Sequence, residues 1–427
     1  MSIILNKEEL LDSNTELRRN ALEILEAGLE AVDTEKILRK KLFVKDGILF
    51  IKNGEDMISV NLPPLKVRGG WVSYEKREGG EVIFIGIGKC ALDGAKVIED
   101  VLGNYLTEGA VIDVREAADA KALASRGKIK YFQGTHPYPS EQNIEATKEI
   151  LKMVENLTEN DLVITLISGG GSSLFELSID MSRTGLDTII ETTKQLTARG
   201  ADIYELNKVR KSMSQVKGGK FAQKCFPARV ISLIFSDVLG NDISVVASGP
   251  TVLDKPNEKV KNILIASNHD ALIAMKIKAE ELGFETTIET EVLSGNASEI
   301  GKDLAERESK PKTCILFGGE TTVKLPAFAE AMAGEGGRNQ EMALSSLPYM
   351  PTDSVLVCAA SDGWDNSDHA GAIADLELFK KSKELNISAE EYLNKSDSYN
   401  FFEKVKGAIC TGKLGSNVSD LFIILYK

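Results

Sequence analysis

The stretch DLVITLISGGGSSLFE joins an apolar run, Leu162–Ile167, to three glycines and two serines. Glycine leaves backbone N–H groups unshielded and serine adds hydroxyl donors, a combination that suits an anion at the start of a helix. A Walker A loop is excluded because no Lys-Ser or Lys-Thr follows the glycines, and a nucleophilic-serine elbow because the G-x-S-x-G spacing is absent. A plain tight turn needs one glycine, seldom three. The predicted anion-binding residues are Gly169, Gly170, Gly171, Ser172 and Ser173.

A second glycine turn, VIFIGIGKCALDGAK, matches the dinucleotide fingerprint G-x-G-x-x-[GA] through Gly86, Gly88 and Ala91. Asp113 follows at roughly the distance expected of a ribose ligand, so hydride transfer with NAD(P) is one interpretation. Lys89 favours another, because an ammonium group at the helix start would lie beside N–H groups that a phosphate or carboxylate approaches. An ordinary surface lysine on a strand–helix turn is the structural alternative.

Carboxylates follow three further apolar runs, at Asp237, Glu320 and Asp362. Carboxylates at strand ends suit a hard cation such as Mg²⁺, which takes oxygen ligands and keeps some of its waters. One of them could instead accept the proton of an attacking hydroxyl. Asp365 and Asp368, in DGWDNSD, could equally hold their loop through Asx turns.

Arg338 lies behind two glycines in GEGGRNQE, where it has little apolar surface to pack on, and this predicts a donor fork for an anion. The stretch NKVRKSMSQVKGGK adds a group of cations, of which Lys211 and Lys220 are predicted to face solvent. His136 lies in the proline-rich loop GTHPYPSEQN, although a lone histidine is more often structural. The other cations of the lysine-rich stretch are Lys208, Arg210 and Lys217.

Short β-branched runs alternate with amphipathic segments along the chain, which predicts an α/β fold with a mainly parallel sheet covered on both faces. In such sheets ligands bind beyond the carboxyl ends of the strands, where the loops above lie. At 427 residues the chain is too long for one core, so we expect two domains, 1–250 and 251–427, with the linker within residues 247–261. The predicted strands are Val82–Ile85, Ala110–Val114, Leu162–Ile167, Val230–Phe235, Ile263–Ala266, Cys314–Phe317, Val355–Ala359 and Leu421–Tyr426.

The overall composition excludes several classes of function. The net charge of −13 without a basic stripe argues against nucleic-acid binding. Five scattered cysteines indicate reduced thiols and a cytoplasmic protein. The first residues lack the apolar core of a signal peptide, and no apolar run reaches the roughly 20 residues of a membrane span, so no membrane association is expected.

Taken in order, these segments resemble the class II glycerate kinases, the family with a MOFRL-type C-terminal half. The resemblance spans nearly the whole chain. It implies ATP-dependent phosphorylation of D-glycerate to 2-phosphoglycerate with a divalent metal such as Mg²⁺. It also implies two three-layer α/β domains, the first Rossmann-like, with the active site in the cleft between them. The matching stretches include GIGKCALDGAK, GTHPYPSEQN, LISGGGSSLFE, NKVRKSMSQVKGGKFA, SDVLGNDISVVASGPTVLD, GGETTV, GEGGRNQEMALS and SDGWDNSDHAGAI.

The resemblance also implies roles for single residues. Lys89 falls at the family's catalytic lysine and Arg338 at its catalytic arginine. We expect Asp237 to be the leading carboxylate, as magnesium ligand or as base, with Asp362 as a second metal ligand. The residues expected to hold nucleotide or substrate, besides the glycine loop, are Asn268, Glu320 and Asn339.

Two alternatives stay open at this stage. An NAD(P)-dependent hydroxypyruvate reductase would use the Gly86 and Gly88 fingerprint, and a non-catalytic anion-binding protein would leave the loop carboxylates without a purpose. The expected partner is a small molecule, D-glycerate, and not nucleic acid or a membrane. If the protein assembles, we expect a homodimer.

Overall fold

The computed structural model describes residues 2–11, 16–65, 67–68, 71–72, 79–116, 118, 127–180, 182–201, 203–307, 310–323 and 336–427. The chain divides into two compact units. Unit 1 is Met1–Asp33 with Ser267–Lys427, and unit 2 is Thr34–Ala266.

This division differs from the predicted domains 1–250 and 251–427 in two places. The N-terminal helix α2 (Glu16–Ala31) packs on α11 (Asn268–Glu281), so the first 33 residues belong with the C-terminal half. Strand β11 (Val260–Ala266) pairs in parallel with β10 (Arg229–Phe235), which places it in the sheet of unit 2. Residues 247–261 are therefore not a linker, because they lie inside unit 2.

Unit 2 is built on a six-stranded sheet in which every described pairing is parallel. The strand order is β11-β10-β9-β6-β7-β8. Numbered along the chain this is 6-5-4-1-2-3, the strand order of dinucleotide-binding α/β sheets. The chain thus moves outward from β6 in one direction and then returns to add β9 on its other side. The remaining strands of this sheet are β6 (Val82–Ile87), β7 (Glu108–Asp113), β8 (Ile129–Gln133) and β9 (Leu162–Ile167).

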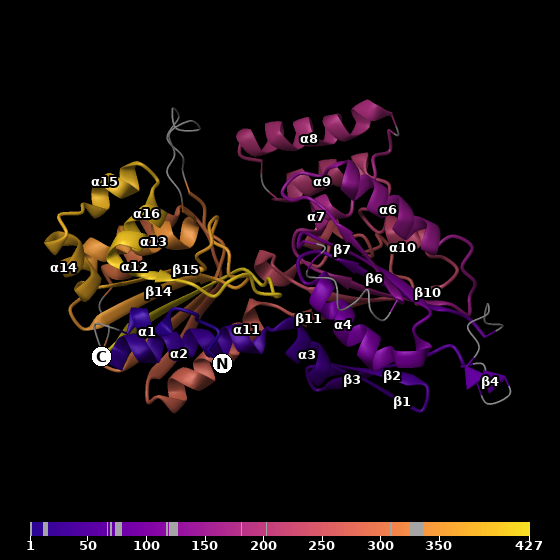
Figure 1. The fold of residues 1–427 in the computed structure, drawn as a ribbon, viewed down its shortest axis with the longest axis horizontal. Helices are drawn as coiled ribbons and strands as arrows, with labels where there is room; N and C mark the ends of the chain where they lie inside the picture. The colour runs from indigo at the N-terminus through magenta and orange to yellow at the C-terminus, as the bar shows by residue number, and fades with distance from the viewer. Residues whose placement is uncertain are drawn as a thin grey trace. The chain divides into compact units, whose positions relative to one another are not determined.

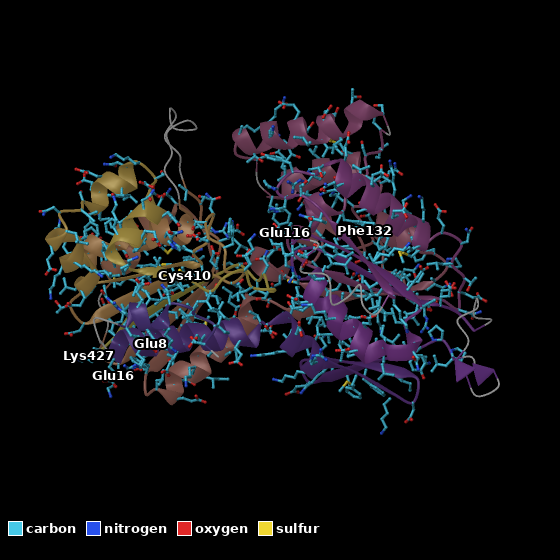
Figure 2. The ribbon with its side chains drawn as sticks, in the orientation of Figure 1. Glu8, Glu16, Glu116, Phe132, Cys410 and Lys427 are labelled. Atoms are coloured by element: carbon cyan, nitrogen blue, oxygen red, sulfur yellow. The ribbon has the colours of Figure 1, made fainter. Side chains whose placement is uncertain are left out.

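Helices cover both faces of this sheet, with α4 on one side and α6, α9 and α10 on the other (Figure 1). The central strands β6 and β9 are buried along their whole length, as expected of apolar runs covered on both faces. Phe132 of β8, labelled in Figure 2, packs at the margin of the core. The helices of unit 2 are α3 (Thr34–Lys41), α4 (Ala91–Leu102), α6 (Glu141–Met153), α7 (Gly171–Leu174), α8 (Arg183–Ala198), α9 (Ile203–Met213) and α10 (Lys220–Lys224).

A small antiparallel sheet precedes the main sheet of unit 2. The turn at Asp46 and Gly47, with φ of 51° and 75°, joins its first two strands, as a two-residue hairpin turn requires. The strands are β1 (Leu42–Lys45), β2 (Ile48–Asn53) and β3 (Asp56–Asn61); a further pair is β4 (Val67–Arg68) and β5 (Trp71–Val72).

Unit 1 contains a mixed sheet in the order β12-β13-β17-β14-β15-β16. Within the described ranges its β12–β13 pairing is parallel and the other four are antiparallel. Helices α2 and α11 pack on one face, and α13 packs on β14 and β15 from the other (Figure 1). The strands are β12 (Glu285–Leu293), β13 (Thr313–Gly319), β14 (Ser354–Ala360), β15 (Gly371–Asp375), β16 (Ala408–Ile409) and β17 (Asp420–Tyr426).

The predicted α/β class, with a mainly parallel first sheet, is confirmed. Among the described residues no helix has the length and apolar character that crossing a membrane requires. The remaining helices of unit 1 are α1 (Lys7–Leu10), α12 (Ala297–Ala305), α13 (Arg338–Ser346), α14 (Leu376–Glu384), α15 (Ala389–Asn394) and α16 (Ser398–Val405).

Candidate active site

The loops after β6 and β9 meet at the centre of the unit 2 sheet, where the strand order reverses. This switch point is where α/β sheets open a crevice for ligands. The backbone N–H of Lys89 donates to the carbonyl of Gly169 at 3.0 Å, and the N–H of Cys90 donates to Ser168 Oγ at 3.1 Å. The two loops predicted to bind anions are thus joined directly.

Gly88 is required by the packing of these two loops. Its φ is +113°, and a Cβ there would lie 2.3 Å from Ser168 Oγ and 2.6 Å from the Ser168 carbonyl oxygen. Gly86 is similarly constrained by Val111, whose Cγ2 would lie 2.9 Å from an added Cβ. Gly86 and Gly88 therefore make room for neighbouring protein atoms. This packing explains why both positions are glycine, and no bound dinucleotide is needed for the explanation.

Asp113 is not available as a ribose ligand. It is fully buried, and its Oδ2 accepts hydrogen bonds from the Leu92 backbone N–H at 3.1 Å and from the Arg115 guanidinium at 2.9 Å. Its Oδ1 accepts from the Arg115 N–H at 3.2 Å. Burial raises the pKa of this carboxyl, and Arg115 opposes the shift. Asp113 is a structural anchor for the start of α4, which weighs against the dinucleotide interpretation.

The glycine loop presents backbone donors, whereas its hydroxyl protons are used within the protein. Within the described part of the chain, the N–H groups of Gly169, Gly170 and Ser172 have no hydrogen-bond acceptor. Ser173 Oγ donates to the Gly170 carbonyl at 3.1 Å, and Ser172 Oγ shares a 2.8 Å hydrogen bond with Ser248 Oγ. The predicted cradle therefore consists of N–H groups, while the serines hold its shape.

Lys89 and His136 flank this loop. A Cβ added at Gly170 would lie 3.3 Å from Lys89 Cγ and 3.4 Å from His136 Cδ2. Gly170 has a φ of +80°, so glycine is favoured there by conformation as well as by space. A lysine and a histidine from two other strand ends thus lie against the predicted anion-binding loop.

A chain of hydrogen bonds connects Ser172 to α9. Ser248 Oγ donates to Asn207 Oδ1 at 2.7 Å, and because an amide oxygen only accepts, the Ser172 proton must be the one shared with Ser248. Ala247 and Ser248 both have positive φ, 51° and 61°, a conformation that L residues rarely adopt. Strain of this kind costs about 1–3 kcal/mol per residue and accumulates at functional sites.

A buried ion pair supports the far end of the loop. Lys217 is fully buried and forms a hydrogen-bonded salt bridge with Glu176, which is 1% exposed. Burial lowers the pKa of Lys217, and Glu176 opposes the shift. Lys217 is one of the cations of the lysine-rich stretch, and the structure pairs its charge with Glu176. Lys220, predicted to face solvent, instead donates to the carbonyls of Lys211 and Ser214 at the end of α9.

Unit 1 contributes the second predicted catalytic cation. Arg338 is the first residue of α13, and its guanidinium binds Asp420 through two hydrogen bonds, Nε–Oδ2 at 2.5 Å and Nη2–Oδ1 at 3.2 Å. Its Nη1 donates to Glu320, whose side chain is 44% exposed. Burial opposes the charge of Arg338, but Asp420 and Glu320 outweigh it and raise its pKa above the ordinary value.

Asp365 caps the start of α13 beside this arginine. It accepts the backbone N–H groups of Asn339 at 3.1 Å and Gln340 at 2.8 Å. Burial, together with the negative charge of Asp420, raises the pKa of Asp365 to about 6. One of the roles that the sequence indicated for Asp365 was to hold its loop, and the contacts of Asp365 agree with that role.

Comparisons with known proteins cover almost the whole chain. A family model described as "Domain of unknown function (DUF4147)" matches residues 20–279, and the MOFRL family model matches residues 313–420. The D-glycerate 2-kinase of Thermotoga maritima is 36% identical over 388 residues, covering 80% of this chain and 90% of that protein. The glycerate 2-kinase of Pyrococcus horikoshii is 35% identical over 398 residues, covering 81% and 87%.

The chain belongs to the class II glycerate kinase family. The crystal structure of a glycerate kinase from Thermotoga maritima has the same fold, with a TM-score of 0.75 and 31% sequence identity over 96% of this chain and 99% of that one. Membership of the glycerate kinases agrees with the buried Asp113 in disfavouring a hydroxypyruvate reductase.

Two predicted ligand-binding residues of this glycerate kinase are engaged inside unit 1. Asn268 is 5% exposed, and its amide nitrogen donates to the Glu291 carbonyl at 2.7 Å. Asn339 is fully buried, and its amide nitrogen donates to Asp365 at 3.2 Å. These contacts hold the starts of α11 and α13, so one amide N–H of each residue is in use.

The predicted metal ligands lie in different units of this glycerate kinase. Asp237 lies two residues after the end of β10 and is partly buried, in unit 2. Asp362, in unit 1, accepts the Trp364 backbone N–H at 3.1 Å. Within the described residues no group of three or more His, Cys, Asp or Glu side chains is arranged to hold a metal ion.

Sequence reasoning missed three partners of the site residues. Asp420 pairs with Arg338 from 82 positions away, and Ser248 pairs with Ser172 from 76 positions away. Asn207 reaches Ser248 across 41 positions. The signal available was that Asn207 and Ser248 stand in stretches quoted for the family resemblance, but nothing local indicated which residues they would contact.

Proposed function

We propose that this chain transfers the γ-phosphoryl group of ATP to the 2-hydroxyl of D-glycerate, giving 2-phosphoglycerate and ADP. A bond forms between the hydroxyl oxygen and the γ-phosphorus, the bond from that phosphorus to the β,γ-bridging oxygen breaks, and the hydroxyl proton passes to a base. The observation that carries the proposal is the switch point, where Lys89 lies against a loop with unused N–H donors. The choice of the 2-hydroxyl rests on the names of the two relatives.

Lys89 and the glycine loop are assigned to the anionic groups of the reactants. Phosphoryl transfer requires positioning and charge neutralisation more than covalent help from the protein. An ammonium group beside aligned N–H groups provides both, because the donors are fixed before the reaction begins. His136 also lies close to Gly170, with its Cδ2 3.4 Å from the position of an added Cβ.

Arg338 is assigned to the charge of the transferring phosphoryl group. Asp420 fixes the plane of its guanidinium through two hydrogen bonds. Glu320 is nearly half exposed, so it is the partner that an incoming anion would replace. Arg338 with both carboxylates has a net charge of −1, so we propose that a cation accompanies the anion that binds there.

A divalent metal fits the donor set, because Mg²⁺ usually binds through one or two carboxylates together with substrate phosphates. Asp237, a carboxylate at a strand end, is the leading ligand in unit 2, and Asp362 is the candidate in unit 1. The metal would neutralise charge on the phosphate oxygens. Asp237 remains the alternative acceptor of the hydroxyl proton.

The test is a pair of coupled assays on the purified chain. One supplies D-glycerate with ATP and MgCl₂ and measures ADP release; the other supplies hydroxypyruvate with NADH and measures its oxidation. We expect turnover in the first and none in the second. Oxidation of NADH without ADP release would reverse the conclusion in favour of a reductase.

Product analysis tests the position of phosphorylation. Phosphorus and proton NMR of the product distinguish 2-phosphoglycerate from 3-phosphoglycerate by the coupling of phosphorus to the proton on C2 or the protons on C3. We expect the 2-isomer. A 3-phosphoglycerate product would refute the proposed position while leaving the kinase activity intact.

A further inference from the structure

Two side chains on α9 have hydrogen-bond donors without acceptors in the described part of the chain. Asn207 is 2% exposed, and its amide nitrogen is buried without a partner, although its oxygen accepts from Ser248. Arg210 is partly buried and forms no hydrogen bond or ion pair with any residue that the structure describes. Because residues three apart lie on the same side of a helix, both sets of donors are on one face of α9.

The charge around Arg210 is positive and uncompensated. Glu176 is the carboxylate whose negative charge acts on Arg210, but that charge is already balanced by the buried Lys217. Glu176, Lys217 and Arg210 together carry one net positive charge, in a protein whose net charge is −13. Burial lowers the pKa of Arg210, with Glu176 and Tyr138 opposing the shift. Such a group is unfavourable unless an anion completes it.

The face of α9 with these donors is held against the glycine loop. Asn207 is joined through Ser248 to Ser172 by two hydrogen bonds of 2.7 Å and 2.8 Å. A Cβ at Gly171 would lie 2.6 Å from Ala247 Cβ, so the strained segment at Ala247 and Ser248 packs closely between loop and helix. Asn207, whose amide nitrogen has no acceptor, is therefore connected by two successive hydrogen bonds to the glycine loop, whose backbone N–H groups also lack acceptors.

We propose that Asn207 and Arg210 bind an oxyanion of a substrate at the glycine loop, either the carboxylate of glycerate or a phosphoryl group of the nucleotide. A guanidinium presents a planar fork of N–H donors that matches the oxygens of either group, and the amide adds one more donor beside it. The inference rests on the proposed function and extends it by naming the residues of α9 that hold the anion.

Direct binding without turnover tests the inference. Calorimetry measures the affinity of D-glycerate alone and of ADP alone for the wild type, Arg210→Gln and Asn207→Asp. The Asn207→Asp variant keeps the oxygen that accepts from Ser248 but replaces the donor with a negative charge. We expect both variants to lose at least tenfold in affinity for the same ligand. Loss confined to glycerate assigns the carboxylate, and loss confined to ADP assigns the phosphoryl group.

The matched control is Lys208→Gln, which removes the same charge from an exposed position on the same helix. It should bind both ligands as the wild type does. Unchanged affinity of Arg210→Gln for both ligands, or an equal loss in Lys208→Gln, would overturn the inference.

Thermal unfolding separates anion binding from a merely structural role. Without ligand, Arg210→Gln should unfold at the wild-type temperature or a few degrees above it, because a partly buried charge without an ion-pair partner has been removed. A lower unfolding temperature combined with weaker binding would indicate a structural residue and contradict the inference.

A failure of the proposed function would be recognised separately. If the wild type does not phosphorylate glycerate, inorganic phosphate and simple carboxylates still serve as probes in the thermal assay. The inference then requires that the wild type is stabilised by one of these anions and that Arg210→Gln loses the stabilisation. An absent shift in the wild type, or a retained shift in the variant, refutes it.

Discussion

The backbone N–H of Lys89 donates to the Gly169 carbonyl at 3.0 Å, so the loops after β6 and β9 form one structure at the switch point of the unit 2 sheet. This bond fixes the backbone of Lys89 independently of its side chain. The side chain can therefore be changed with little effect on the position of the loop.

Replacement of Lys89 by alanine should lower kcat by about 10²–10³, because a preorganised group that stabilises transition-state charge contributes about 3–4 kcal/mol. The measurement is steady-state kinetics with D-glycerate and Mg·ATP. Lys96→Gln, on α4 and paired with Asp93, is the control and should retain near-normal turnover. Near-normal turnover in Lys89→Ala would remove Lys89 from the mechanism.

Replacement of Gly88 by alanine should lower the free energy of unfolding by more than the same replacement at Gly200. Both glycines have positive φ, +113° and +76°, but a Cβ at Gly88 meets Ser168 at 2.3 Å while one at Gly200 meets nothing within 4 Å. Backbone strain alone costs about 1–2 kcal/mol, and overpacking adds about 1–3 kcal/mol at Gly88. Denaturant titrations of the two variants measure the difference. Equal losses would mean that the contact with Ser168 relaxes freely.

The two carboxylates that bind Arg338 should respond differently to neutralisation. Asp420 is buried, so Asp420→Asn should lower the free energy of unfolding by about 3 kcal/mol and lower kcat as the guanidinium loses its fixed plane. Glu320 is 44% exposed, so Glu320→Gln should change stability by less than about 1 kcal/mol. Its KM for an anionic substrate should fall, since a competing negative charge is gone. A rise in that KM would make Glu320 a ligand instead.

Stability should depend on pH through Glu341 of α13. Burial raises the pKa of this carboxyl to about 7, with Asp365 adding to the shift. Between its ordinary value of 4.5 and about 7 the folded protein holds a proton that the unfolded chain has lost. The stabilisation by this proton is complete at low pH and is lost as the pH rises through about 7.

Glu341→Gln should therefore match the wild type near pH 4 and exceed it near pH 8 by on the order of 2 kcal/mol. Denaturant titrations at several pH values measure both proteins, provided that each unfolds in one transition. Parallel stability curves for the two proteins would show that Glu341 titrates alike in the folded and unfolded chain.

The central strands were predictable from sequence, and so was the edge strand β11, whereas the edge strands β8 and β12 were not. β6 and β9 are buried along both faces and appear as unbroken apolar runs. β8 and β12 lie at the edges of their sheets and alternate irregularly between buried and exposed residues, so their sequences, IKYFQ and ETTIETEVL, lack a clear period. β15, GAIAD, is fully buried but rich in small residues that do not favour strands.

In the candidate site, too, some residues could be located from the sequence, whereas the contacts between distant residues could not. Lys89 and the glycine loop follow apolar strands directly, so the carboxyl-end rule for parallel sheets located them. The pairing of Ser172 with Ser248, or of Arg338 with Asp420, depends on how distant segments pack, and one sequence does not encode that in any local pattern. The use of the serine protons within the protein was missed for the same reason.

The chain passes between the two units twice, after Asp33 and after Ala266, so unit 2 is an insertion within unit 1. On a ribosome, unit 2 is complete once residue 266 has emerged. Helix α2 is made before unit 2, yet the α11, β14 and β17 segments that it packs against are made after unit 2. An added Cβ at Gly28 of α2 would meet Met275 Cγ at 2.6 Å, and Met275 is synthesised about 250 residues after Gly28. Helix α2 is thus translated before unit 2 but reaches its native packing only after unit 2 is complete.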